Sequence, residues 1–234
     1  MGTRFQTIEK GRLMHVDVII PTFGRPAALE KNVKSILNST HKDVTIFVVI
    51  DGDPSLLPIV AKWPVAVIYN KDRRDWVYSI NRGMQYARGD GVLYAVDDLE
   101  FPPIMIAELV KAMETHFPGG DGLIGMKQKP TAVQGAIGLM GRKFIEHFPR
   151  RHVMCPDFIH FSCDFEIGRY ARVNNKFFYV ETATLLHHHL RDKTNSLVQQ
   201  TKLRDRGISS QRRPKEFIWG TTFDLITEGR WADR

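Results

Sequence analysis

The chain has 234 residues, of which 43% are hydrophobic and 25% are charged, and its formal net charge is +7. This composition is ordinary for a globular domain and excludes fibrous and intrinsically disordered classes. No apolar run approaches the ~18–20 residues that span a bilayer, and the first residues lack the apolar core of a signal peptide, so we expect a cytoplasmic protein without a transmembrane segment.

The positive charge indicates an anionic partner, such as nucleotide phosphates, nucleic acid or an acidic membrane surface. From Arg191 to the end, ten Lys and Arg stand against six Asp and Glu, a net charge of +4, although such a run is usually a solvated face. Cys155 and Cys163 have no CxxC context, so we expect free thiols without a catalytic role.

The N-terminal half alternates apolar strands with amphipathic helices. We expect strands at residues 16–20, 44–50, 65–69 and 92–96, and helices at 26–38, at about 76–87 and after Pro103. Four such β/α units predict an α/β fold with one mostly parallel sheet flanked by helices. The GxGxxG and GxxxxGK[ST] motifs are absent, which argues against dinucleotide-binding and P-loop sites.

The pattern changes after Gly122. Residues 123–127 and 136–141 indicate strands, with antiparallel pairing expected, and residues 177–180 and 182–186 indicate two more; helices are expected at 142–148 and 164–173. We therefore expect one domain over residues 1–189, with a nucleotide-binding half at 16–120 and a smaller, antiparallel acceptor-side half at 121–189. A basic C-terminal extension would occupy residues 190–234.

Acidic residues follow two of the expected strands. Asp51 and Asp53 come after the second strand, and Asp97 and Asp98 come after the strand at 92–96. Open α/β sheets bind ligands at the carboxyl ends of their strands. Adjacent carboxylates repel each other, so a cation such as Mg²⁺ or Mn²⁺, shared with substrate phosphates, would explain the pair. The alternative is a solvated acidic turn that caps the helix beginning near Pro103.

Other candidate groups lie in the second half. His187, His188 and His189 follow the last expected strand, so either His187 and His189 share one face or His188 acts alone, unless all three belong to a solvated strand end. Asp164 and Glu166 are candidates for the base that activates an attacking hydroxyl. Acids at a helix start also occur simply because they stabilise the helix dipole.

Six segments match, in order and spacing, motifs of one known family. They are VDVIIPTFGRP (16–26), VIDGDP (49–54), SINRGMQYARGDGVLYAVDD (79–98), GAIGLMGRKFIEHF (135–148), CDFEIGRYA (163–171) and YVETATLLH (179–187). The chain resembles the family 2 inverting glycosyltransferases of the GT-A fold over residues 16–189. It departs from their motifs where Val96 replaces the first acid of the DxD motif, Ile80 an arginine, and Cys163 a glutamate.

The resemblance implies a metal-dependent glycosyltransferase that moves a sugar from a nucleoside diphosphate, typically UDP, to an acceptor hydroxyl with inversion. It implies that Asp98 and His187 hold Mn²⁺ or Mg²⁺, and that Asp164 is the general base. Asp51 would hydrogen-bond the nucleotide base. The expected donor-binding residues are Pro21, Thr22, Arg25, Asp51, Asp53, Arg74, Asn81, Gly83 and Asp97.

The acceptor is left open among hydroxymethylated DNA, a glycan and a lipid. The basic tail and the segment Arg150–His152 favour an anionic contact, with DNA or with an anionic lipid surface. Two other functions compete. A nucleotidyltransferase of related topology would need a glycine-rich phosphate loop, which is absent. A non-catalytic nucleic-acid-binding protein is consistent with the charge, yet no RNA-binding signature or zinc pattern occurs.

Overall fold

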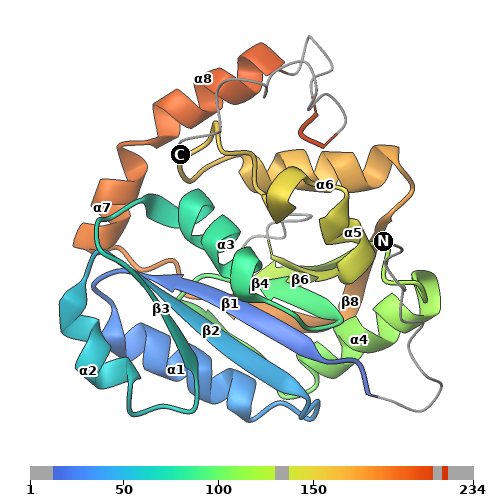
Figure 1. The fold of residues 1–234 in the computed structure, drawn as a ribbon, viewed down its shortest axis with the longest axis horizontal. Coiled ribbons are helices and arrows are strands. Elements are labelled where there is room, and N and C mark those ends of the chain that lie inside the picture. Colours follow the sequence, from blue (N-terminus) through green and yellow to red (C-terminus); the bar gives the residue numbers. More distant parts are fainter. Residues whose placement is uncertain (1–12, 130–136, 213–217, 221–234) are drawn as a thin grey trace, which may run out of the picture.

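The computed structural model describes residues 13–129, 137–212 and 218–220 (Figure 1). Its strands are β1 (Val16–Thr22), β2 (Val44–Asp51), β3 (Ala66–Asn70), β4 (Gly91–Tyr94), β5 (Leu99–Glu100), β6 (Leu123–Lys129), β7 (Gly138–Gly141) and β8 (Phe177–His187). Its helices are α1 (Pro26–Leu37), α2 (Leu57–Val60), α3 (Asp75–Tyr86), α4 (Met105–His116), α5 (Arg142–Glu146), α6 (Cys163–Val173), α7 (Lys193–Gln199) and α8 (Lys202–Arg212).

The strands form one sheet in the order β3-β2-β1-β4-β7-β6-β8-β5. β3, β2, β1 and β4 are parallel, β7 runs antiparallel to both β4 and β6, and β5 runs antiparallel to β8. The chain passes from β1 to β2 on one side and later enters β4 on the other. The strand order therefore reverses beside β1, and this is where open α/β sheets bind their ligands.

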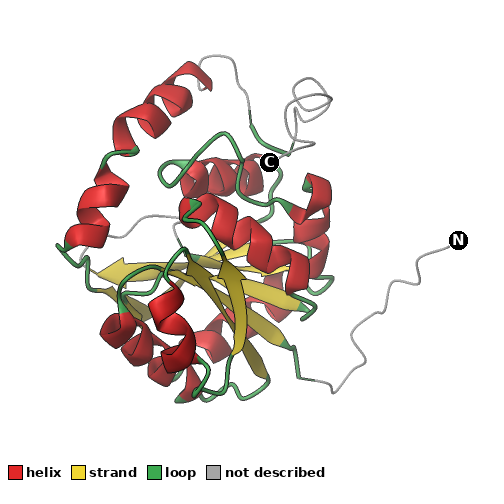
Figure 2. Cartoon of the chain, turned by 60° about the vertical axis from the view of Figure 1, so that its left-hand side comes forward, coloured by secondary structure: helices red, strands yellow, loops and turns green. Residues whose placement is uncertain are grey.

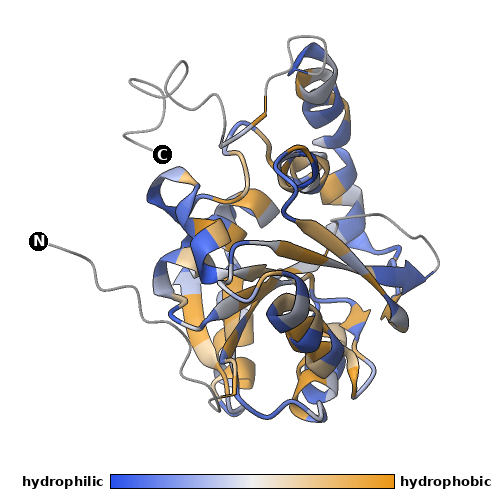
Figure 3. Ribbon diagram, turned by 90° about the vertical axis from the view of Figure 1, so that its right-hand side faces the viewer, coloured by the Kyte–Doolittle hydropathy of each residue, from blue (hydrophilic) through white to orange (hydrophobic). Residues whose placement is uncertain are grey.

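Helices cover both faces of the sheet, as Figure 2 shows. One apolar core joins Val18 and Ile20 of β1 to α1 and α4, and a second core joins Ile19 to α3, α5 and α6. Successive strand residues point to opposite faces, which is why neighbours on β1 enter different cores. In Figure 3, apolar residues gather along the strands, while the outer turns of the helices are mostly hydrophilic.

The α/β fold expected from the sequence is confirmed, including the antiparallel pairing of β6 with β7. The two strands expected at 177–180 and 182–186 are one strand, β8, and that prediction was wrong. Its pairing with β6 contains an irregularity between Met126 and Lys127, so the polar residues of β8 at this point do not end the strand. Cys155 and Cys163 are free and buried. The expectations for residues 1–12 and for Trp231 lie outside the described residues.

Glycine at one position of α3 lets this helix lie close to β1. A Cβ atom placed on Gly83 would stand 2.5 Å from Cγ2 of Ile19, whereas one placed on Gly207 of α8 would have no atom within 4 Å. Both glycines are helical, so replacement by alanine brings each the same gain in helix propensity, up to ~1 kcal/mol.

We expect Gly83→Ala to lower the free energy of unfolding, because overpacking costs about 1–3 kcal/mol and outweighs the propensity gain. The matched control Gly207→Ala should raise it. Urea denaturation of both variants measures the difference. Equal stabilisation by the two substitutions would contradict the close contact between α3 and β1.

Candidate functional site

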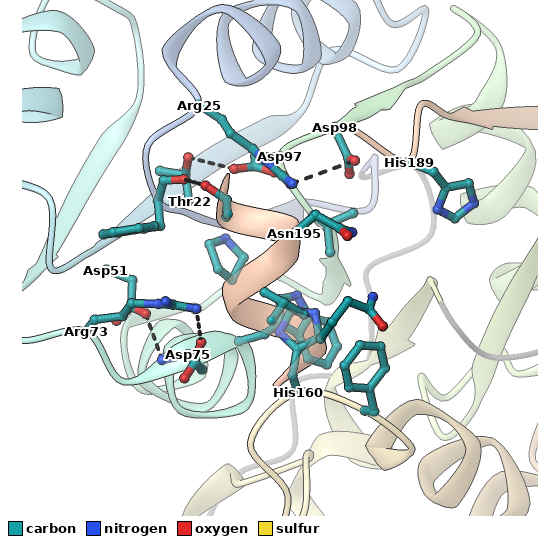
Figure 4. Close-up of a pocket in the computed structure, with 18 of the residues that line it drawn as sticks. Thr22, Arg25, Asp51, Arg73, Asp75, Asp97, Asp98, His160, His189 and Asn195 are labelled. Carbon is teal, nitrogen blue, oxygen red and sulfur yellow. Dashed lines mark hydrogen bonds and ion pairs between the residues drawn. The ribbon is translucent and has the colours of Figure 1, made fainter. Parts of the chain in front are cut away.

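A cavity of about 270 Å³ opens at the carboxyl ends of the parallel strands, and we call it the strand-end cavity. Figure 4 shows the side chains that line it. They come from the loops after β1, β2 and β4, from the end of β8, and from α7. Pro21, Thr22, Arg25, Asp51, Asp97, Asp98 and His187, which the sequence singled out, all line this one cavity.

Arg25 joins the two carboxylates that follow β4. Its Nη1 lies 3.1 Å from Oδ1 of Asp97 and 3.8 Å from Oδ2 of Asp98 (Figure 4). Thr22 Oγ1 donates a hydrogen bond of 2.9 Å to Oδ2 of Asp97. Burial raises the pKa of Asp97 to about 6 although Arg25 opposes the shift, while the surrounding carboxylates raise the pKa of Arg25 despite its burial. The pair of adjacent acids is thus compensated by a cation of the protein itself.

Asp51 is buried at the end of β2, where its carboxylate accepts hydrogen bonds from neighbouring segments. The backbone amides of Arg74 and Asp75 donate to it at 2.9 and 2.7 Å, and Asn70 Nδ2 donates at 2.8 Å. These donors hold the carboxylate at the start of α3. They leave part of its capacity of about four acceptor positions for a ligand.

The histidines after β8 alternate between two environments. β8 pairs with β5 so that His187 stands opposite Leu99, which brings His187 Nε2 to 3.1 Å from Oδ1 of Asp98. The His187 and His189 rings stack with their centroids 3.7 Å apart, and both line the strand-end cavity. His188 points elsewhere, to Glu100. Burial opposes the shift, but the hydrogen bond from His187 lowers the pKa of Asp98 to about 2, so this carboxylate is charged.

A second cavity of about 260 Å³ adjoins the first, and we call it the α6 cavity. The two share six lining residues, namely Trp76, Val96, His160, Phe161, His187 and His189. Asp164 lines only the α6 cavity, and burial raises the pKa of its carboxyl to about 6. Glu166, the alternative base, lies instead beside Arg212, with Nε 3.0 Å from Oε1, and lines neither cavity.

Four residues expected at the donor lie outside both cavities. Asp53 caps the helical turn Pro54–Leu56 by accepting a hydrogen bond from Ser55 N. Asn81 exchanges two hydrogen bonds with the backbone of Met154, Gly83 packs on Ile19, and Arg74 lies over the ring of Tyr78. In this structure these residues serve packing and loop positions around α3.

The sequence gave little signal for α7, which forms one wall of the strand-end cavity. Thr194, Asn195, Val198 and Gln199 line the cavity. The helix begins after Asp192, which accepts a hydrogen bond from Asn195 N at 2.8 Å and also pairs with Arg25, whose Nε lies 2.8 Å away. An N-cap aspartate is visible in a sequence, but its partner 167 residues earlier is not. The division of the chain at residue 190 stays a prediction.

Comparison with known proteins places this geometry in a family. The family model described as glycosyl transferase family 2 matches residues 17–171. The chain belongs to this family. The family predicted from the sequence motifs is therefore confirmed.

Two curated proteins resemble this family 2 chain over part of its length. It is 31% identical over 105 residues to an uncharacterized glycosyltransferase, YwdF, of Bacillus subtilis, covering 44% of this chain and 39% of that protein. It is 30% identical over 120 residues to a dolichol-phosphate mannosyltransferase of Pyrococcus furiosus, covering 49% of this chain and 33% of that protein. The chain thus matches little more than a third of these relatives' length.

Solved structures share the fold of this family 2 chain at low sequence identity. The mannosyltransferase PcManGT of Pyrobaculum calidifontis, solved with GDP-Man and Mn²⁺, superposes with a TM-score of 0.61 at 15% identity, covering 78% of this chain and 59% of that one. Residues 1–349 of S. aureus TarS in complex with UDP give a TM-score of 0.63 at 14% identity, covering 74% and 60%. These likenesses establish the GT-A type of fold.

The role of Asp192 in holding α7 can be tested by two substitutions. Asp192→Ala removes both the helix cap and the pairing with Arg25, whereas Asp192→Asn keeps a capping oxygen and loses the charge. Since a lost cap costs about 1 kcal/mol, we expect Asp192→Ala to speed amide hydrogen exchange in Lys193–Gln199 by about fivefold, and Asp192→Asn to have a smaller effect. Unchanged exchange in both variants would show that α7 is held by other contacts.

Proposed function

We propose that this chain transfers a glycosyl group from a nucleoside diphosphate sugar, with uridine as the favoured nucleoside, to an acceptor hydroxyl by a single inverting displacement. The observation that carries the proposal is the pair of adjoining cavities. One is lined by Asp51, Arg25, Asp97 and Asp98, and the other by Asp164. Donor and acceptor would meet at their shared wall. The glycosyltransferase relatives and the structural neighbours with GDP-Man and UDP support a donor of this class.

The strand-end cavity supplies groups for each part of such a donor. Asp51, with acceptor capacity left over, suits the imide N–H of a uracil ring, and Arg25 offers positive charge to a diphosphate. Because the guanidinium is already held by carboxylates, it does not have to reorganise when charge develops on the leaving diphosphate. Preorganised charge of this kind stabilises a transition state more than a mobile group does.

The residues present fit a divalent cation. Asp98 and His187 contribute an ionised carboxylate and an imidazole nitrogen 3.1 Å apart, although no cluster of three or more His, Cys, Asp or Glu that could hold a metal occurs among the described residues. Mg²⁺ and Mn²⁺ commonly use one or two protein ligands and complete their shell with phosphate oxygens and water. Such an ion, held by Asp98 and His187, would supply charge neutralisation for the departing diphosphate.

Asp164 fits the role of general base better than Glu166 does. It stands in the first turn of α6 and lines the cavity that adjoins the donor, whereas Glu166 is engaged by Arg212. With its pKa raised to about 6 by burial, the carboxyl is mostly ionised at pH 7, yet it is a stronger base than an exposed aspartate. It would take the proton from the acceptor hydroxyl as that oxygen attacks the anomeric carbon.

The α6 cavity also indicates the kind of acceptor. Phe161 and Phe165 bring aromatic faces to it, Phe165 with 47% of its surface exposed, and Arg206 of α8 lies at the same cavity. Aromatic faces suit the apolar side of a sugar ring, and an arginine suits a neighbouring anionic group. We therefore favour a glycan acceptor, free or attached to an anionic carrier such as a lipid, over hydroxymethylated DNA in this cavity. No helix among the described residues has the length and apolar character needed to cross a membrane.

The base assignment is tested by Asp164→Asn with Glu166→Gln as its control. General base catalysis contributes roughly 10²–10⁴-fold, so we expect Asp164→Asn to lower the kcat of transfer by that factor while donor affinity is kept. Glu166→Gln should retain transfer within a few-fold. In the unaltered protein, kcat should rise with pH through an ionisation near 6, because the protonated carboxyl cannot accept a proton. Transfer that survives Asp164→Asn would contradict the proposed mechanism.

The donor and metal assignments are tested by thermal shift. A ligand that binds only the folded state raises the melting temperature, so UDP- and GDP-sugars are compared with and without Mn²⁺. We expect a rise with the donor that Mn²⁺ increases, and loss of the Mn²⁺ effect in Asp98→Asn, whose own melting temperature without ligand serves as the folding control. No shift with any nucleotide sugar would argue against the strand-end cavity as a donor site.

A further inference from the structure

A third cavity lies on the side of α3 that faces away from the sheet, and we call it the α3 cavity. Its volume is about 550 Å³, larger than either cavity described above. Arg74, Tyr78, Arg82 and Tyr86 line it from α3 and its N-cap, and His152 and Phe158 line it from the segment between β7 and α6. It touches the strand-end cavity only through Arg73 and Asp75, so the proposed transfer leaves it unexplained.

The arginines of this cavity carry charge that the described part of the protein does not neutralise. Arg73 pairs with Asp75, but neither Arg74 nor Arg82 has a carboxylate partner among the described residues. Nε of Arg82 is buried without a hydrogen-bond partner there, and its Nη1 reaches only Tyr78 Oη, at 3.5 Å. A guanidinium held in this way is suited to the oxygens of a phosphate group.

Aromatic and apolar groups stand beside these charges. The guanidinium of Arg74 lies 4.4 Å from the centre of the Tyr78 ring, and Tyr86 exposes 52% of its surface. Val77, Pro156, Phe158 and Ile159 add apolar walls. A ligand that suits this lining has a flat ring next to a phosphate, which is the chemistry of a nucleotide unit.

The positive charge continues past the cavity along α3. Arg88 Nη1 donates to the carbonyl of Gln85 at 2.7 Å, Gln85 Nε2 donates to the carbonyl of Arg150, and Arg151 Nη1 lies 3.4 Å from the carbonyl of Ala87. Arginines therefore gather at both ends of α3, whose twelve residues span roughly 18 Å. A track of this length exceeds one nucleotide and favours a polymer.

We propose that the α3 cavity and this arginine track bind a segment of single-stranded nucleic acid, with one base against Tyr78 and Tyr86 and successive phosphates on Arg74, Arg82 and the arginines beyond. A positively charged track with aromatic side chains for stacking is how single strands are bound without sequence preference. A duplex fits less well, because its bases are already stacked and unavailable to the tyrosines. This site is separate from the donor cavity and does not depend on the transfer reaction.

The test measures the affinity of the full chain for a fluorescein-labelled thymidine decanucleotide by anisotropy, at 50 to 200 mM salt. We expect Arg82→Gln to weaken binding about tenfold and to reduce the slope of log K against log salt by ~0.7, the change for one phosphate contact with a single strand. Tyr86→Ala should also weaken binding about tenfold through lost stacking. Lys111→Gln removes the same charge from α4, across the sheet, and should leave affinity unchanged.

Further arms separate the other readings. Val198→Trp fills the strand-end cavity from α7 and should leave decanucleotide binding intact; loss of binding there would assign the strand to the donor cavity and overturn the proposal. Arg74→Gln, at an exposed position, repeats the test should Arg82→Gln lower the melting temperature. Equal weakening by Lys111→Gln, no effect of Tyr86→Ala, or binding to anionic vesicles but not to the decanucleotide would each overturn it.

Discussion

The arrangement of the strand-end cavity depends on one guanidinium held among three carboxylates. Arg25, in the loop between β1 and α1, contacts Asp97 and Asp98 after β4 and Asp192 before α7. Buried acids side by side are tolerated only when a cation compensates them, and removing one partner of such a group leaves a charge without compensation. Three segments far apart in the chain are thereby tied together at the position where the strand order reverses.

This compensation also shapes what the cavity can do. Two acids that share one arginine do not share it equally: Asp97 takes the closer contact and the hydrogen bond from Thr22, whereas Asp98 is turned toward His187. Asp98 therefore has a ligand-type neighbour, and Asp97 acts through Arg25. The degraded DxD motif, with Val96 in place of an acid, still leaves one carboxylate available beside an imidazole.

The sequence allows prediction of whatever follows from local pattern. Continuous apolar runs predict the parallel strands, and acids directly after such runs must meet at one edge of the sheet, which is why Asp51, Asp97 and Asp98 were found. The rule of alternation also anticipates that His187 and His189 share a face. Residues on α3 could not be assigned in this way, because Asn81 and Gly83 contact Met154 and Ile19 through the packing angle of the helix. That angle depends on contacts between distant segments.

The C-terminal segment shows the same difficulty in a sharper form, because its charges suggested a solvated basic tail. Asp205 of α8 is instead fully buried and accepts hydrogen bonds from the backbone amides of Ile159, His160 and Phe161. It thereby holds the loop that forms the wall between the two cavities. Burial lowers the pKa of His160 in that wall to about 4, so its imidazole is neutral at pH 7. Since His160 contributes no charge, the positive charge that a diphosphate needs in this cavity must come from Arg25, from Arg73 and from any cation on Asp98, which returns the chemistry to the guanidinium between the acids.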